Sequence, residues 1–595
     1  MKKSIIYGII FLIIIITAGL YAMDKPEEIR EPESPDSVQV EEQYDDWVLD
    51  FSSGIEDENS FPVSGTQQRV RNVIGKTALE ANAHPAYLSA PSSGQNLGFS
   101  VGGAKDIQNF RDNIANGYVP LPSSITYEGL FYDYYFDTGQ EESSDDEMFS
   151  PSYSMASIGN RQKEENELWL SVGLNSNIQE SDFSRKKLNL VVVLDISGSM
   201  ESAFDQYYYD SKGLTGENTD KRSKLSIAAE TVCDMLSHLK KDDRFGMVVF
   251  ENSAYLAKPL NLVGSTNMEK IRDHIKDLHT MGGTNMYAGM QEGTKLFNPY
   301  LNTDKGEYEN RIIFLTDAMP NREMTDKYSL WGVLKENSEK GLYSTLIGVG
   351  VDFQSELVEA ISKVEGANYY SIHTAADFKK RLEEEFDYMV TPLVFDLNLV
   401  LDAEGYEIVK VCGAPYSAES SGEIMKVGTL FPSVSEDEKV RGGIILVQLK
   451  QIDRQGDIRL IAGYNDREGN HHSSSRKVDM QKYLVSSVIN SGIKKGVLLV
   501  HYADILRDWA KATRGDGGTE VSEDDWQYNQ LQSNRKTRAL NEWEQESIPL
   551  RVNSYYLEQF LKMKEQIINY IRINNDKEFQ KEIELLDKLI KAGKK

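Results

Sequence analysis

Five side chains with hard oxygen donors follow predicted strands or open a predicted helix in this sequence. They are two carboxylates and three hydroxyls: Asp195, Ser197, Ser199, Thr284 and Asp317. Mg²⁺ takes about six oxygen ligands in octahedral geometry and usually keeps some of its waters. If the fold brings these side chains together, we expect them to bind one divalent cation, Mg²⁺ in the first place, with Mn²⁺ or Ca²⁺ as alternatives.

The elements that must position these residues alternate between short apolar runs and helical patterns. The apolar runs predict strands at 188–194, 245–250, 312–315, 342–350 and 369–372, with a further antiparallel edge strand at 255–263. Helical patterns lie between them, near 224–240, 267–279, 286–297, 327–339, 354–364 and 375–389. This alternation predicts an α/β domain, a doubly wound and mostly parallel sheet with helices on both faces. Ligands of such sheets bind beyond the carboxyl ends of the strands, where Asp195 and Asp317 stand.

The spacing Asp195-x-Ser197-x-Ser199, together with Gly282-Gly283-Thr284 and a hydrophobic strand ending in Thr316-Asp317, resembles a known metal site. It is similar to the metal-ion-dependent adhesion site of von Willebrand factor type A domains, with all five side chains in the family's order. The resemblance implies a Rossmann-like fold for 188–390. It also implies ligation by the three hydroxyls, and coordination by the two aspartates either directly or through water.

The resemblance further implies that an open metal position takes a Glu or Asp from a protein partner. Neutral hydroxyl ligands leave the cation under-neutralised, which favours an incoming carboxylate. In this family the last helix, here about 375–388, can shift on ligand binding. The sequence departs from many relatives at Ala318-Met319-Pro320-Asn321, where they have Gly. That departure alters the loop and leaves the ligand set intact.

The sequence outside this domain resembles prokaryotic surface proteins that carry a type A domain at their centre. The likeness rests on Val101-Gly102-Gly103-Ala104-Lys105-Asp106, on the Tyr-rich segment 127–136 and on the strands after the α/β domain.

A long insert over 204–222 separates the metal loop from the first helix of the domain. It contains Tyr207, Tyr208 and Tyr209, and it must emerge on the metal's side of the sheet. Exposed tyrosines there would form an adhesive rim around the cation. The alternative is a loop that packs on its own domain.

Several function classes fit this sequence poorly. The net charge of −28 is a poor match to nucleic acid, whose binding depends on Lys and Arg. Ser197 and Ser199 lack the Gly-x-Ser-x-Gly frame of a nucleophile elbow, and the chain has no phosphate loop with the full Gly-x-x-x-x-Gly-Lys-Ser/Thr frame. We therefore expect no catalysis, and an adhesion protein that recognises a partner carboxylate. The alternative is a non-adhesive assembly or regulatory subunit of a membrane or secretion complex, with the domain as its docking module.

The N-terminus predicts an extracytoplasmic protein. Lys2 and Lys3 precede an uncharged apolar run over 5–21, and acidic residues follow it, which places the rest of the chain outside the cytoplasm. The run is either a membrane anchor or a signal peptide that is cleaved. We expect contact with a membrane only through this segment.

Composition and pattern divide the rest of the chain. The expected segments are a signal peptide or anchor (1–23), an acidic disordered stalk (24–48), a small N-terminal domain (49–139), an acidic linker (140–166), a strand joining a later β unit (167–187), the type A domain (188–390), a β-sandwich-like domain (391–475) and a C-terminal helical region (476–595). The strand at 167–174 predicts that the type A domain is inserted into the β unit. The last region is expected to hold helices near 479–512 and 553–593. Cys233, on the apolar stripe of a predicted helix, is expected to be a buried free thiol.

Overall fold

The computed structural model describes most of the chain after residue 42. The described ranges are 43–50, 96–101, 108–139, 148–160, 165–180, 183–202, 222–301, 306–317, 329–349, 361, 363–372, 385–414, 417, 421–436, 439–453, 456–478, 490–515 and 548–594. The chain separates into residues 1–43 and residues 44–595, and all named helices and strands belong to the second unit. No helix within the described ranges is both long and apolar enough to span a bilayer. The apolar run at 5–21 lies outside them.

The α/β domain is built on a six-stranded sheet in the order β10-β9-β8-β5-β6-β7. Its strands are β5 Lys187–Asp195, β6 Arg244–Phe250, β7 Ala254–Leu262, β8 Tyr308–Thr316, β9 Leu342–Val349 and β10 Asn368–Ile372. Neighbouring strands are parallel except β6 and β7, which pair antiparallel at one edge. The predicted doubly wound fold and its antiparallel edge strand are both confirmed.

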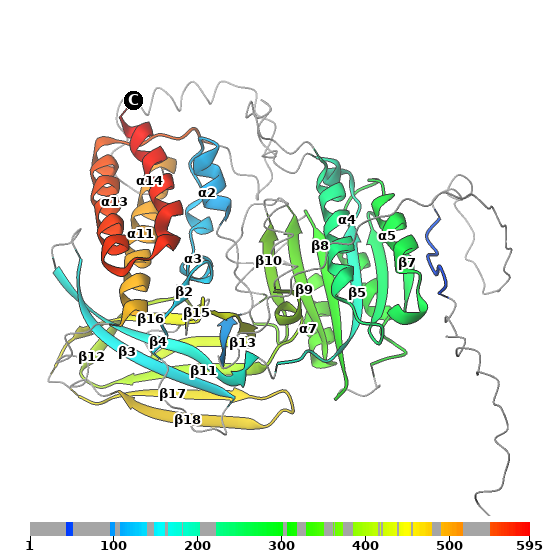
Figure 1. Ribbon diagram of the computed structural model, residues 1–595, viewed down its shortest axis with the longest axis horizontal. Helices are drawn as coiled ribbons and strands as arrows, with labels where there is room; N and C mark the ends of the chain where they lie inside the picture. Colours follow the sequence, from blue (N-terminus) through cyan, green and yellow to red (C-terminus); the bar gives the residue numbers. More distant parts are fainter. Residues whose placement is uncertain are drawn as a thin grey trace, which may run out of the picture. The chain divides into compact units, whose positions relative to one another are not determined.

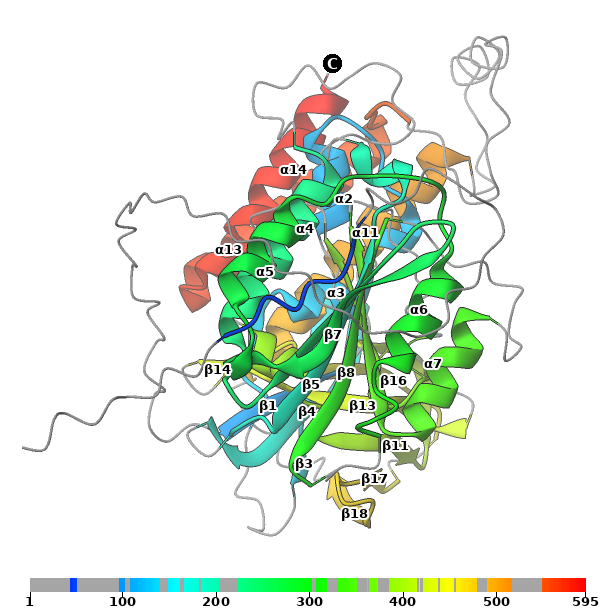
Figure 2. The same ribbon diagram turned by 90° about the vertical axis from the view of Figure 1, so that its right-hand side faces the viewer.

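Helices cover both faces of this sheet, as Figure 2 shows. They are α4 Lys224–Met235, α5 Met268–Lys276, α6 Met286–Lys295 and α7 Leu330–Glu339, with short 3₁₀ helices at Leu236–His238 (η5) and Val263–Ser265 (η6). Alternate residues of β5 point to opposite faces. Leu190 and Val192 pack with α4 and α5, whereas Val191 and Val193 pack with α6 and α7. Of the last two expected helices, residues 361, 363–364 and 385–389 are described; residues 361 and 385–389 are helical, whereas residues 363–364 form a turn.

The second sheet has nine antiparallel strands in the order β12-β16-β4-β1-β13-β11-β17-β18, with β3 also paired to β4 (Figure 1). The strands are β1 Asn96–Val101, β3 Phe149–Asn160, β4 Glu165–Gln179, β11 Val394–Ala403, β12 Tyr406–Cys412, β13 Glu423–Ser433, β16 Ile444–Gln451, β17 Ile458–Asn465 and β18 His471–Val478. The branch strand β3 meets the last strand of this order, β18, since the Tyr153 hydroxyl on β3 donates to the Lys477 carbonyl on β18 at 2.9 Å. The sandwich-like unit is therefore one sheet curled around one core.

The α/β domain interrupts this β unit in the chain. β4, which contains the strand expected at 167–174, pairs with β16 and precedes β5 in the chain, and β11 follows the α/β domain. Two neighbouring segments differ from expectation. β1, expected in a separate small domain, pairs with β13 and β4. β3, expected within a linker, pairs with β4 along its whole length because Phe149, Tyr153 and Met155 face the core.

A helical layer packs on the β unit (Figure 1). It consists of α2 Gln108–Ala115, α3 Tyr127–Tyr132, α11 Ser491–Arg514, α13 Ser554–Asn574 and α14 Gln580–Gly593, with 3₁₀ helices at Pro122–Ser124 (η2) and Lys577–Phe579 (η8). A small sheet of β14 Ser435–Glu436, β15 Lys439–Arg441 and β2 Tyr135–Phe136 lies beside it. The described residues of 108–136 thus share one core with the C-terminal helices, which corrects the expected separate domain at 49–139.

The long helix expected over 553–593 is wrong, because the chain turns between α13 and α14. Asn575 ends α13 with φ of 52°, in the left-handed region that Asn tolerates better than most residues. The Asp576 side chain then caps η8. The polar sequence Asn574-Asn575-Asp576 could have indicated this turn.

The last residues of the expected disordered stalk are ordered. The Tyr44 amide donates to the Ser265 carbonyl and the Val48 amide to the Ala257 carbonyl, both at 2.9 Å. Asp46 lies 3.0 Å from the ammonium of Lys258, which is fully buried. Residues 44–48 therefore lie along the β7 edge of the α/β domain, where Asp46 neutralises a buried charge.

Candidate metal centre

The carboxyl end of β5 places Asp195 inside the protein. β5 and β8 are parallel neighbours, so Asp195 and Thr316 emerge side by side. Asp195 is 0% exposed, and both of its carboxylate oxygens accept a hydrogen bond. The Ser197 amide donates to Oδ1 at 2.8 Å, and the Thr316 hydroxyl donates to Oδ2.

The two serines connect the aspartates. A 3₁₀ helix, η4 Gly198–Glu201, begins directly after Ser197 and turns Ser199 back toward it. The two hydroxyl oxygens lie 3.1 Å apart, and the Ser199 hydroxyl donates to Asp317 Oδ1 at 2.7 Å. Asp195, Ser197, Ser199 and Asp317 thus form one continuous hydrogen-bonded set, and four of the five predicted residues come together.

Thr284 lies on the adjoining loop. The Gly198 amide donates to the Gly282 carbonyl at 3.2 Å, and the Met281 amide donates to the Ile196 carbonyl at 2.7 Å. These two hydrogen bonds hold the loop that carries Thr284 against the loop at 195–199. The Thr284 side chain is exposed, and within the described residues no hydrogen bond joins it to the other four.

Gly282 explains why this loop approaches so closely. Its φ is +64°, and a Cβ there would lie 1.8 Å from a carboxylate oxygen of Glu251. Glycine alone combines that backbone conformation with that space.

Lys224 is a member of the site that sequence reasoning missed. Its Nζ lies 3.0 Å from Asp317 Oδ2, and the two side chains are 4% and 2% exposed. Lys224 is the first residue of α4, after the capping Ser223. Helix α4 packs on the sheet after the loop at 195–199, so it must start close to that loop. Its first residue, Lys224, could therefore have been predicted as a neighbour of the site.

Two other predictions fall outside the described residues. They concern the rim of Tyr207, Tyr208 and Tyr209, and the loop Ala318-Met319-Pro320-Asn321. Both remain predictions. Cys233 is buried and free, as expected, and so is Cys412.

The electrostatics of the site suit a cation. Burial raises the pKa of the Asp195 carboxyl to about 6, and the nearby Asp317 adds to the shift, against the hydrogen bonds from Thr316 and Ser197. A divalent cation would relieve this cost, because it favours the ionised form of both aspartates. The described residues contain no cluster of three or more His, Cys, Asp or Glu side chains that could hold an ion. A metal here therefore depends on the hydroxyl oxygens as well, and hard oxygens fit Mg²⁺.

Residues 190–319, which include all five predicted ligands, match the family model described as von Willebrand factor type A domain. The chain contains a type A domain. Its Rossmann-like fold is the one that the alternating pattern predicted.

Curated relatives match the type A region and its surroundings. The pig inter-alpha-trypsin inhibitor heavy chain H1 is 24% identical over 220 residues, which is 36% of this chain and 22% of the relative. The mouse voltage-dependent calcium channel subunit alpha-2/delta-3 is 24% identical over 268 residues, which is 43% of this chain and 22% of the relative. The chain thus spans about a fifth of the length of these relatives. A solved von Willebrand factor type A structure from Catenulispora acidiphila covers 62% of this chain and 81% of its own, with 15% identity and a TM-score of 0.34.

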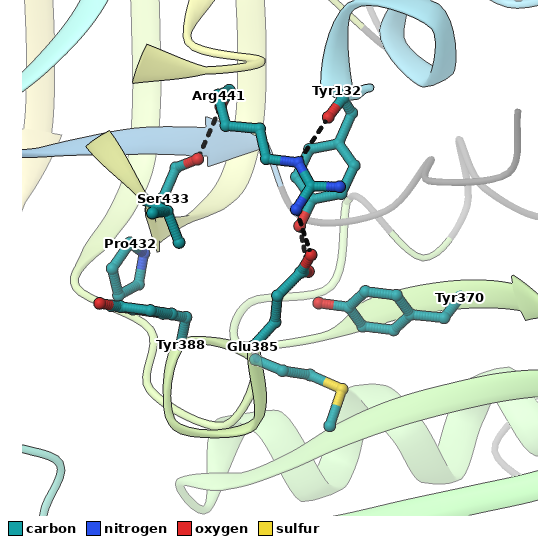
Figure 3. Close-up of a pocket in the computed structure, with 9 residues that line it drawn as sticks. Tyr132, Tyr370, Glu385, Tyr388, Pro432, Ser433 and Arg441 are labelled. Atoms are coloured by element: carbon teal, nitrogen blue, oxygen red, sulfur yellow. Dashed lines mark hydrogen bonds and ion pairs between the residues drawn. The ribbon is translucent and has the colours of Figure 1, made fainter. Parts of the chain in front are cut away.

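A small pocket lies where the type A domain meets the β unit and α3, and Figure 3 shows its side chains. Arg441 lies 2.8 Å from Glu385, which also accepts a hydrogen bond from the Tyr132 hydroxyl. The Arg441 Nε donates to the Tyr132 carbonyl at 3.1 Å. These side chains satisfy one another, so we interpret the pocket as a junction between the two parts and not as a ligand site.

Proposed function

We propose that this protein is an extracytoplasmic binding or adhesion protein. Its type A domain would recognise a carboxylate of a protein partner through one divalent cation, Mg²⁺ in the first place. Asp195, Ser197, Ser199, Thr284 and Asp317 would hold the cation, and the open coordination position would take the partner's Asp or Glu. The N-terminal segment would deliver the chain across the membrane, either as an anchor or as a cleaved signal.

One observation carries the proposal, namely the convergence of two buried aspartates and two serine hydroxyls at the carboxyl edge of the sheet. Buried carboxylates are costly unless a cation or hydrogen bonds compensate them. The exposed Thr284 beside them leaves one side of the site accessible. The proposed role is binding without catalysis, with both aspartates acting as metal ligands.

Calorimetric titration of the full chain with Mg²⁺, Mn²⁺ and Ca²⁺ tests the metal site. We expect saturable binding at one site, lost in Asp195→Ala and strongly weakened in Thr284→Ala. Asp402→Ala and Ser475→Ala are matched controls on exposed positions of the β unit, and they should bind as the wild type does. Equal and weak binding by all five proteins would reject the metal-dependent function and indicate diffuse attraction to acidic residues.

A second experiment tests the carboxylate. Acetate, titrated into the Mg²⁺-saturated protein, should bind weakly at one site, and it should not bind after EDTA treatment. Acetate binding that is independent of the metal would contradict recognition through the cation.

The alternative function is a docking module within a larger membrane or secretion complex. It is favoured by the way the type A domain is held to the β unit through Glu385 and Arg441, since a fixed orientation suits a single fixed partner. Affinity purification from the native source, with and without chelator, separates the two functions. One stoichiometric partner favours docking, and several metal-dependent ligands favour adhesion.

A further inference from the structure

The site contains a cation of its own, the ammonium group of Lys224. It lies 3.0 Å from Asp317 Oδ2, while Ser199 holds Oδ1 of the same carboxylate at 2.7 Å. Both oxygens of Asp317 therefore have partners within the protein. An incoming metal ion must share or replace these partners to use Asp317 as a ligand.

The position of Lys224 is unfavourable apart from this contact. A helix N-terminus carries partial positive charge, so a basic residue at the first position of α4 is repelled by the helix dipole. Burial of the ammonium adds a further cost unless a carboxylate pairs with it. Asp317 offsets both costs, which ties the start of α4 to the metal site.

A charge count gives the consequence for binding. The two aspartates carry two negative charges, and Lys224 cancels one of them. A divalent cation then leaves the loaded site with one net positive charge. Without Lys224 the loaded site would be neutral, and it would attract an anionic partner less.

We propose that Lys224 sets two affinities of this site in opposite directions. It weakens metal binding, because it competes for Asp317. It strengthens binding of a carboxylate to the loaded site, because it leaves that site positively charged. Lys224 is thus a positioning and selectivity residue, and the inference rests on the proposed metal-dependent function.

The test compares wild type, Lys224→Gln, Lys224→Arg and Lys335→Gln in the full chain. Lys335 is an exposed lysine on α7, on the other face of the sheet, and serves as the matched control. Each protein is titrated with MgCl₂, and each Mg²⁺-saturated protein is then titrated with acetate. A charge within ~4–6 Å commonly changes an ionic equilibrium by about tenfold or more. We therefore expect Lys224→Gln to bind Mg²⁺ about tenfold more tightly and acetate several-fold more weakly, and Lys224→Arg and Lys335→Gln to stay near wild type.

The outcomes separate this inference from the proposed function. If wild type binds Mg²⁺ and Lys224→Gln binds it equally or more weakly, the inference is overturned and the function stands. If only Lys224→Gln binds Mg²⁺, the inference stands and the native metal-dependent function fails. If neither protein binds, both fail.

Lys224→Gln could fail to fold, because the buried Asp317 would then lack a cation. The inference can still be tested in that case. The melting temperature is then measured with and without MgCl₂. Metal that binds the folded state raises it, so recovery of a folding transition in MgCl₂ supports the inference. A variant that stays unfolded at saturating MgCl₂ overturns it.

Discussion

Gly282→Ala adds only one methyl group, but it should strongly distort the loop that carries Thr284. The residue has φ of +64°, and a Cβ would lie 1.8 Å from a Glu251 carboxylate oxygen. An alanine in this conformation costs about 1–2 kcal/mol in backbone strain. The clash must also displace Glu251, which is 7% exposed.

The contacts of Glu251 set the rest of the magnitude. Its carboxylate accepts hydrogen bonds from the Ser253 amide at 3.2 Å, from the Tyr255 hydroxyl at 3.0 Å and from the Asn252 amide. A hydrogen bond to a charged group contributes about 1.5–3 kcal/mol. Loss or distortion of two of them adds roughly 2–4 kcal/mol to the strain, since the displaced carboxylate regains some hydration.

Gly469→Ala is the matched control for this prediction. Gly469 has φ of +82° in the turn between β17 and β18, and a Cβ there would meet nothing within 4 Å. It should show the backbone strain alone. Urea unfolding followed by circular dichroism measures both variants, and Mg²⁺ titration measures the site. We expect Gly282→Ala to be the less stable of the two and to bind Mg²⁺ at least about tenfold more weakly than wild type, because a misplacement of about 1 Å in a site is costly. Equal stability of the two variants would refute the steric argument.

Two further predictions concern the helical layer. Burial raises the pKa of Asp133, but Arg111 and Lys581 together hold it below its usual range. The stability that the ionised Asp133 contributes is thus fully present above its unfolded pKa of about 4, and it is lost as pH falls toward the folded pKa. When the free energy of unfolding is measured against pH, its decrease below pH ~4 should therefore be shallower in Asp133→Asn than in wild type. Asn575→Gly should raise the melting temperature slightly and Asn575→Val should lower it, since φ of 52° strains a β-branched residue; the opposite order in scanning calorimetry would contradict the turn between α13 and α14.

The sequence was sufficient to predict that four of the five residues of the candidate metal centre lie together, because its signals are local. Each aspartate directly follows a buried apolar run, and parallel strands bring their carboxyl ends to one edge. The helix expected near 224–240 begins at Lys224 as predicted, but hydrophobic periodicity does not indicate that the side chain of its first residue reaches Asp317. The role of Gly282 depends likewise on Glu251, whose position follows from the turn between β6 and β7.

The β unit was less predictable, because its pairings join distant segments. Alternation in Glu167–Leu174 predicted a strand and its partnership with the later β unit, and β4 pairs with β16. Nothing in residues 96–101 indicates that this strand pairs with β13, which lies beyond the whole type A domain. The acidic residues at 140–147 hid the alternation of β3 that follows them.

The insertion also explains how the site is presented. One contact between the domain and the β unit lies at the amino ends of the strands, where Arg467 of the β unit pairs with Glu309 near the start of β8. Arg185, just before β5, pairs with Asp243, just before β6, and with Asp387. β5 has nine residues, so Asp195 lies at the far end of a strand of roughly 30 Å at the usual rise per residue. Because these contacts lie at the edge of the sheet opposite Asp195, they do not compete with the binding that we propose at the carboxyl edge.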